Sequence, residues 1–244
     1  MMNAIATLPL TRLALAFIPV LLVIGILFKW RLDAYNAIYA LIRMLAQLLL
    51  VGFFLSTLFA SRSAGLVVSI LALMIVIASW IALGSIKTNR RQLYTKAFLA
   101  MALGSGSTLF IISAFVIELE PWYEPRYLIP LGGMIFANAM NSMSLAAERL
   151  ESEISRNRRY DQARTIAFHA ALIPIVNSLF AVGLVALPGM MTGQILSGIS
   201  PFIAARYQIM VMCMLFASSG LTTACFLVLI KKDFIGGLSD KLQR

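Results

Sequence analysis

Charged residues are scarce in this 244-residue chain: they make up 12% of it, whereas 61% of the residues are hydrophobic, and the mean hydropathy is +0.90. Soluble domains average about 25% charged and about 45–50% apolar residues, so one buried core cannot hold this apolar excess. The composition therefore excludes a soluble enzyme. Acidic residues are scarcest, 10 against 20 Lys and Arg. In a membrane protein such an excess indicates topology rather than nucleic-acid binding.

Residues that carry chemistry are also few. No phosphate-binding loop, HExxH or GxSxG motif is present, so neither catalysis nor a bound cofactor is expected of this chain. His169, the one histidine, makes no metal site alone, and the sequence leaves any metal ligands unknown. Cys213 and Cys225 lie about 18 Å apart along a helix, too far to pair. Because the apolar runs contain no Asp or Glu, an ion-coupled carrier is disfavoured.

Seven runs are long enough to cross about 30 Å of hydrocarbon and lack the alternation of a membrane barrel. The backbone groups of such runs must bond within a helix, which predicts an all-α polytopic membrane protein. The runs are Leu8 to Phe28, Ala37 to Ala60, Ala64 to Ile86, Ala97 to Ile117, Tyr127 to Ala147, Ala170 to Met191 and Tyr207 to Ile230.

The cations predict the orientation. With the amino terminus outside, fifteen Lys and Arg fall on the inner side and four on the outer side, while Arg43 lies inside the second run, four residues before Gln47. This bias predicts a cytoplasmic carboxyl terminus and a multi-pass protein of the cell's inner (plasma) membrane.

The segment 148–169 connects the fifth and sixth runs, carries nine charges and contains neither Gly nor Pro, which predicts a charged cytoplasmic helix. Two interpretations remain open. It is either a solvated extension of the fifth run or a surface that meets a partner.

Two features within the runs suggest a route. Met134, Asn138 and Asn141 share a face of the fifth run, as interhelical contacts or as the wall of a pathway. Pro188 interrupts the sixth run, where Gly183, Gly189 and Gly193 allow close backbone approach. The break is typical of a substrate site or of a kinked helix packed against a twin. Beside it, Met190 and Met191 are either filler or soft ligands suited to Cu(I).

The stretches PLGGMIFANAMN (130–141), LPGMMTGQI (187–195) and ARYQ (205–208) resemble the permease subunits of the FetB-type bacterial iron-export ABC transporters and the related plant aluminium-sensitivity permeases. The resemblance covers roughly the carboxyl-terminal half. It implies a permease without its own nucleotide-binding domain, present twice per transporter, with ATP bound on a separate ATPase. The resemblance also implies that Asn177 is one of the residues characteristic of this family.

One departure concerns the segment between the fifth and sixth runs, which is longer in that family and includes a helix that resembles an ATPase-coupling element. Here either the coupling surface is shortened to the stretch from Arg156 to Arg164, or the coupling to an ATPase is altered or lost. The residues assigned to ATPase coupling are Glu148, Arg156, Arg158, Arg159 and Arg164.

The sequence thus predicts a single permease domain over residues 1–244. It is a homodimeric subunit in membrane lipid that exports an iron-like metal ion or a small solute by ATP-driven alternating access. The expected pathway residues are Met134, Asn138, Asn141, Asn177, Pro188, Met190 and Met191, with Gly183, Gly189 and Gly193 for helix packing. The alternatives are an ATP-independent channel or carrier, and a membrane scaffold.

Overall fold

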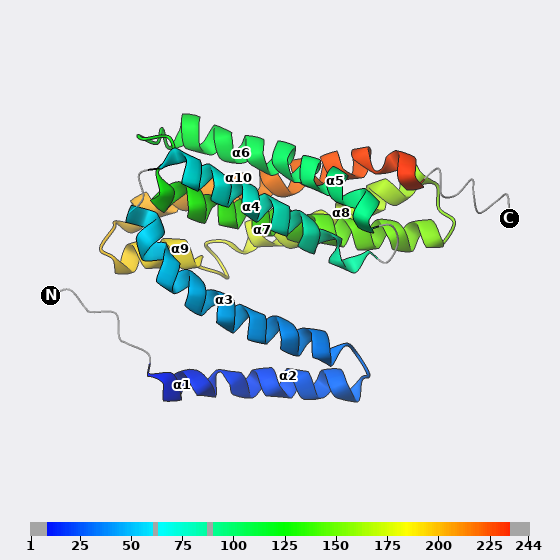
Figure 1. The fold of residues 1–244 in the computed structure, drawn as a ribbon, viewed down its shortest axis with the longest axis horizontal. Coiled ribbons are helices and arrows are strands. Elements are labelled where there is room, and N and C mark those ends of the chain that lie inside the picture. Colours follow the sequence, from blue (N-terminus) through cyan, green and yellow to red (C-terminus); the bar gives the residue numbers. More distant parts are fainter. Residues whose placement is uncertain (1–8, 61–62, 87–89, 235–244) are drawn as a thin grey trace. The chain divides into compact units, whose positions relative to one another are not determined.

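The computed structural model describes residues 9–60, 63–86 and 90–234, and every regular element in these ranges is helical (Figure 1). Contacts divide the chain into two compact units, Met1–Ala60 (unit 1) and Ser61–Arg244 (unit 2). The all-α prediction is confirmed.

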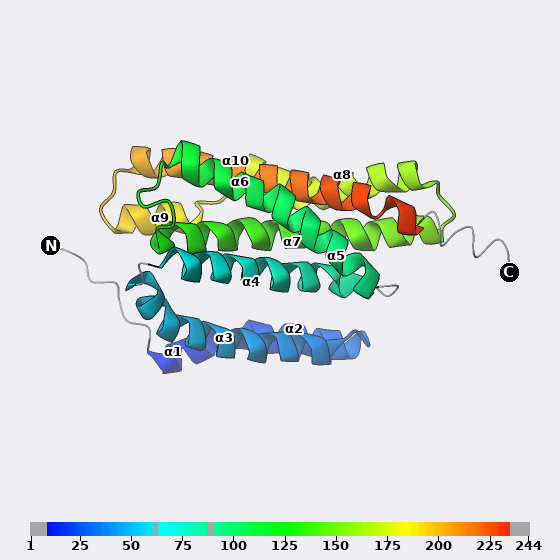
Figure 2. The same ribbon diagram turned by 45° about the horizontal axis from the view of Figure 1, so that its top comes forward.

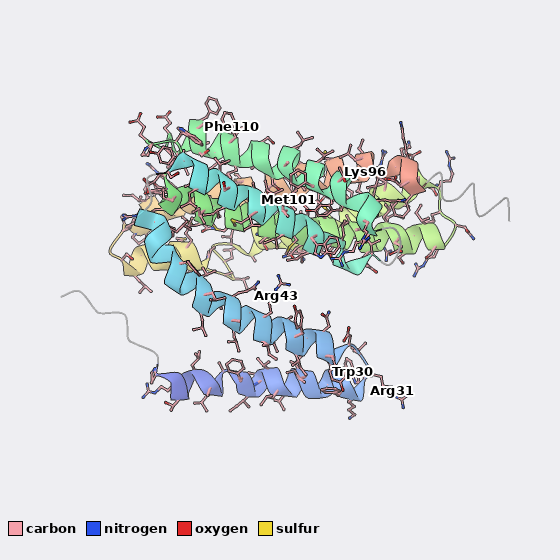
Figure 3. The ribbon with its side chains drawn as sticks, viewed as in Figure 1. Trp30, Arg31, Arg43, Lys96, Met101 and Phe110 are labelled. Atoms are coloured by element: carbon pink, nitrogen blue, oxygen red, sulfur yellow. The ribbon has the colours of Figure 1, made fainter. Side chains whose placement is uncertain are left out.

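The described part of unit 1 has three apolar helices, α1 (Leu10–Leu15), α2 (Phe17–Lys29) and α3 (Ala34–Ala60). Helix α1 is followed almost at once by α2, and a short corner joins α2 to α3. Asp33 Oδ1 accepts a hydrogen bond from the Asn36 backbone N–H at 3.0 Å, which satisfies a free donor at the start of α3. Arg43 is exposed and projects from α3 on the side away from α2 (Figure 3).

Unit 2 is a bundle of long helices that run side by side (Figure 2). A continuous helical stretch from Arg90 to Val116 contains two π-helical turns, η2 and η3. The elements are α4 (Ala64–Ala82), η1 (Leu83–Ser85), α5 (Arg90–Ala100), η2 (Met101–Ser105), α6 (Gly106–Ile111), η3 (Ile112–Val116), α7 (Pro125–Ser155), α8 (Tyr160–Ala181), α9 (Gly189–Leu196) and α10 (Pro201–Leu229).

Helix α7 is the centre of unit 2, because it packs against α4, α8 and α10. Two glycines set the closest approaches in the bundle. A Cβ on Gly132 of α7 would lie 2.7 Å from Leu71 Cδ2 of α4, and one on Gly104 of η2 would lie 2.5 Å from the Thr222 backbone nitrogen of α10. Small residues at such crossings let helices pack tightly in a membrane.

Six described helical segments are long and apolar enough to cross a membrane. Helix α7 is not among them although its 31 residues extend about 46 Å. Asn138 and Asn141 lower its hydropathy. A polytopic helical protein is therefore confirmed, while the count of seven spans and the orientation remain predictions.

The predicted sixth span, Ala170 to Met191, is wrong in its boundaries: the helix is α8, Tyr160–Ala181. It ends where Val182 becomes extended and Gly183 takes a φ of +81°. Glycine accepts that conformation without strain. Pro188 therefore does not kink a continuous helix but directly precedes a separate helix, α9. The last helix, α10, begins at Pro201, six residues before the predicted start at Tyr207.

The prediction of one charged helix over 148–169 is also wrong. Helix α7 continues through the charged residues as far as Ser155, a turn follows, and α8 begins at Tyr160. The turn contains Asn157 with a φ of +59°. Asparagine tolerates this conformation better than most residues, so the chain reverses without Gly or Pro.

Candidate functional site

A pocket of about 420 Å³ lies between α7, α8, α9 and α10. Its lining comes from the three long helices α7, α8 and α10, from the segment between α8 and α9, and from the start of α9. The lining residues are Met134, Asn138, Ile175, Ser178, Ala181, Val182, Ala186, Pro188, Gly189, Met190, Gln208, Val211, Met212 and Leu215.

The pocket walls are mainly apolar, and three side chains bring polar atoms to them. Asn138 Nδ2 donates to the Met134 carbonyl at 3.0 Å, and Ser178 Oγ donates to the Pro174 carbonyl at 2.9 Å. Gln208 is only 6% exposed, and its Oε1 has no hydrogen-bond partner among the described residues. Gln208 Oε1 is therefore a buried acceptor that a bound molecule could satisfy.

The structure brings some of the predicted pathway residues together and leaves others apart. Met134, Asn138, Pro188 and Met190 line the pocket, although they come from different helices. The remaining three do not line it: Asn141, Asn177 and Met191. Asn141 is exposed on α7, and Asn177 is exposed on α8.

Sequence reasoning missed the pocket face of α10. Gln208, Val211, Met212 and Leu215 follow the i, i+3, i+4, i+7 spacing of one helix face. This spacing could have been found, but α10 carries apolar residues on all sides, so the face does not stand out.

The three glycines predicted for helix packing make no close contact within the part of unit 2 that the structure describes. A Cβ on Gly183, Gly189 or Gly193 would meet nothing within 4 Å among the described residues. Within unit 2 the close packing is made instead by Gly104 and Gly132.

A cluster of charges fixes the turn between α7 and α8. Glu153 is 1% exposed, and its Oε1 lies 2.8 Å from Arg149 Nη2, while its Oε2 lies 2.8 Å from Arg158 Nε. Arg156 Nη1 is 3.8 Å from Oε1. A buried carboxylate needs such partners. The Glu153 carbonyl also accepts from the backbone N–H groups of Arg156 and Arg158.

Further ion pairs tie other helices to the same end of unit 2. Asp161 at the start of α8 pairs with Lys231 after α10 at 3.2 Å, and Lys96 of α5 pairs with Asp233. Arg164 lies 3.9 Å from Asp161. Of the residues predicted for ATPase coupling, Arg156 and Arg158 pair with Glu153 while remaining exposed, and Glu148 and Arg159 are exposed as well.

Residues 10–235 match the profile of the uncharacterised protein family UPF0014. The chain is 36% identical to the UPF0014 membrane protein slr1647 of Synechocystis sp., over 79% of this chain and 80% of that protein. It is 33% identical to the "Probable iron export permease protein FetB" of Escherichia coli, over 88% of each chain.

A plant relative extends the similarity. The chain is 29% identical to the protein ALUMINUM SENSITIVE 3 of Arabidopsis thaliana, over 83% of this chain and 78% of that protein. No solved structure matches the chain significantly. The resemblance seen in the sequence is confirmed, and it extends beyond the carboxyl-terminal half to nearly the whole chain.

Proposed function

This chain belongs to the UPF0014 family, and we propose that it is the membrane permease subunit of an ABC exporter whose ATPase is a separate chain. It is a multi-pass membrane protein, and a relative that it matches over 88% of its length bears the name of an iron export permease. The observation that carries the proposal is the pocket, which gives unit 2 a place to hold a solute between four helices.

The charges of unit 2 support an orientation. Ten of its described Lys and Arg lie near the end that holds the turn between α7 and α8, and two, Arg126 and Arg206, lie near the other end. By the positive-inside rule the first end is cytoplasmic in the plasma membrane, and the pocket lies nearer the outer side.

The ATPase docks on the turn between α7 and α8. The buried Glu153 cluster makes this corner rigid, so a force applied to the exposed Arg159 reaches both helices, and each of them lines the pocket. Two copies form the transporter, and Gly193 of α9, where a Cβ would meet nothing within 4 Å among the described residues, offers room for close helix contact between them.

Affinity purification from the native membrane in mild detergent tests the proposal. The full chain is expected to bring down a P-loop ATPase at a fixed stoichiometry. Arg159→Glu should weaken that association at least tenfold. Arg126→Glu, the matched charge reversal at the opposite end, should leave it unchanged.

Three outcomes would contradict the proposal. Reproducible absence of an ATPase would overturn the ABC assignment. Transport by the purified chain alone would favour an ATP-independent channel or carrier. Unimpaired transport after the pocket is filled by Val211→Trp, with normal folding, would show that the solute does not pass through this pocket.

A further inference from the structure

We propose that the pocket binds a soft monovalent cation, Cu(I) or Ag(I), through the thioether sulfurs of Met134, Met190 and Met212. The inference deepens the proposed function, because it names the class of substrate for the same pocket. The three methionines come from α7, α9 and α10, so the fold gathers them from distant parts of the chain.

Methionine is concentrated at this pocket. Three of the fourteen lining residues are methionine, against 13 of the 244 residues in the chain, which is about four times the average. Methionines that only fill gaps in the core occur elsewhere in unit 2. Met101 and Met143 are completely buried and line no part of this pocket. The pocket thus draws one methionine from each of three helices.

The remaining donors select against hard cations. Among the described residues that line the pocket, none carries a carboxylate, an imidazole or a thiol. Hard divalent and trivalent cations need carboxylate or other charged oxygen ligands to offset the cost of losing water. Thioethers are soft, neutral ligands that favour Cu(I), and a single positive charge is the least costly charge to bury.

The neutral polar groups suit one positive charge. The partial negative charge of the unpartnered Gln208 Oε1 is available to the ion or to a water molecule that it retains. The carboxyl end of α8, at Ala181, and the amino end of α9, at Gly189, both line the pocket. The negative end of the 22-residue α8 offsets the positive end of the eight-residue α9.

The test is Ag(I) binding to the full chain in detergent. Cys213→Ala and Cys225→Ala are introduced first, because free thiols bind silver. Equilibrium dialysis with measurement of bound metal should then show one saturable Ag(I) per chain. Each of Met134→Leu, Met190→Leu and Met212→Leu should weaken the affinity by about tenfold or more, since leucine keeps the volume and removes the sulfur.

The matched controls are Met143→Leu, on α7 but outside the pocket, and Fe(II) as a cation that prefers nitrogen and oxygen ligands to thioethers. Met143→Leu should leave silver binding unchanged, and Fe(II) should neither bind at the pocket nor compete. Thermal unfolding and gel filtration confirm that each variant is folded.

The proposal is overturned if the chain shows no saturable Ag(I) binding. It is also overturned if the triple leucine variant binds silver as tightly as its parent, or if Met143→Leu weakens binding as much as the pocket variants. The measurement needs neither ATP nor transport. A failure of this inference is therefore distinguishable from a failure of the ATPase assignment.

Discussion

Replacing Gly104 with alanine tests the packing that positions the pocket helices. The new Cβ would lie 2.5 Å from the Thr222 backbone nitrogen and 2.6 Å from its Cα. Both are backbone atoms, so no side-chain rotation can relieve the contact, and η2 must move away from α10. The movement would also strain the hydrogen bond of 2.8 Å between Ser105 Oγ and Thr222 Oγ1. We expect the free energy of unfolding to fall by about 3 kcal/mol.

The matched control lies two residues along the same helical stretch. A Cβ on Gly106 would meet nothing within 4 Å, so Gly106→Ala should be neutral or should stabilise by up to about 1 kcal/mol. Reversible unfolding in mixed micelles, followed by circular dichroism, measures both. Thr222→Ala should not rescue Gly104→Ala, because the backbone contacts remain. Equal stability of Gly104→Ala and wild type, or equal losses for both glycines, would refute the reasoning.

Three further predictions concern the turn, the end of α8 and the pocket. Glu153→Gln should destabilise the fold by about 1–2 kcal/mol because it replaces charge-assisted contacts with Arg149 and Arg158 by neutral ones, whereas the exposed Glu148→Gln should change stability by less than about 0.5 kcal/mol; chemical unfolding compares them. Gly183→Ala should cost about 1 kcal/mol because alanine is strained at a φ of +81°, which thermal melting would reveal. Gln208→Leu should stabilise the protein by about 1 kcal/mol by removing an unsatisfied acceptor, yet abolish transport in vesicles. A loss of stability in Gln208→Leu, or an unaffected Glu153→Gln, would contradict these assignments.

The sequence is enough to predict the helices but not where two of them begin and end. Hydropathy identifies apolar runs, and a span was expected to begin only after the last charge, near Ala170. The helix itself begins at Tyr160, and its first turns include the charged residues Asp161 and Arg164. Asp161 is held there by an ion pair with Lys231, which follows α10. Such a long-range ion pair leaves no trace in the local sequence.

The turn between α7 and α8 was unpredictable for a similar reason. It uses Asn157 rather than glycine or proline, and it is held by a glutamate whose partners are spread over ten residues. Local propensity favours a continuous helix through this segment, and the buried Glu153 cluster overrides it.

Part of the lining of the pocket could be predicted from the sequence. Helical periodicity correctly placed Met134 and Asn138 on one face of α7, and the glycines and proline near 188 correctly marked a break. Gln208, the last residue of the ARYQ stretch, and Met212 were not assigned to the pathway, because which face of α10 meets α7 and α8 depends on the packing of the bundle.

The central claim is that a solute passes through the pocket of unit 2 under the control of ATP. A cysteine at Val211, which lines the pocket, tests it most directly in a chain lacking Cys213 and Cys225. We expect a membrane-impermeant thiol reagent to label Val211→Cys from the side opposite the Glu153 cluster, and we expect ATP and the partner ATPase to change the labelling rate. Ser219→Cys, which is buried like Val211 but lies outside the pocket, should stay unlabelled. Labelling of Val211→Cys as slow as that of Ser219→Cys, with and without ATP, would contradict it.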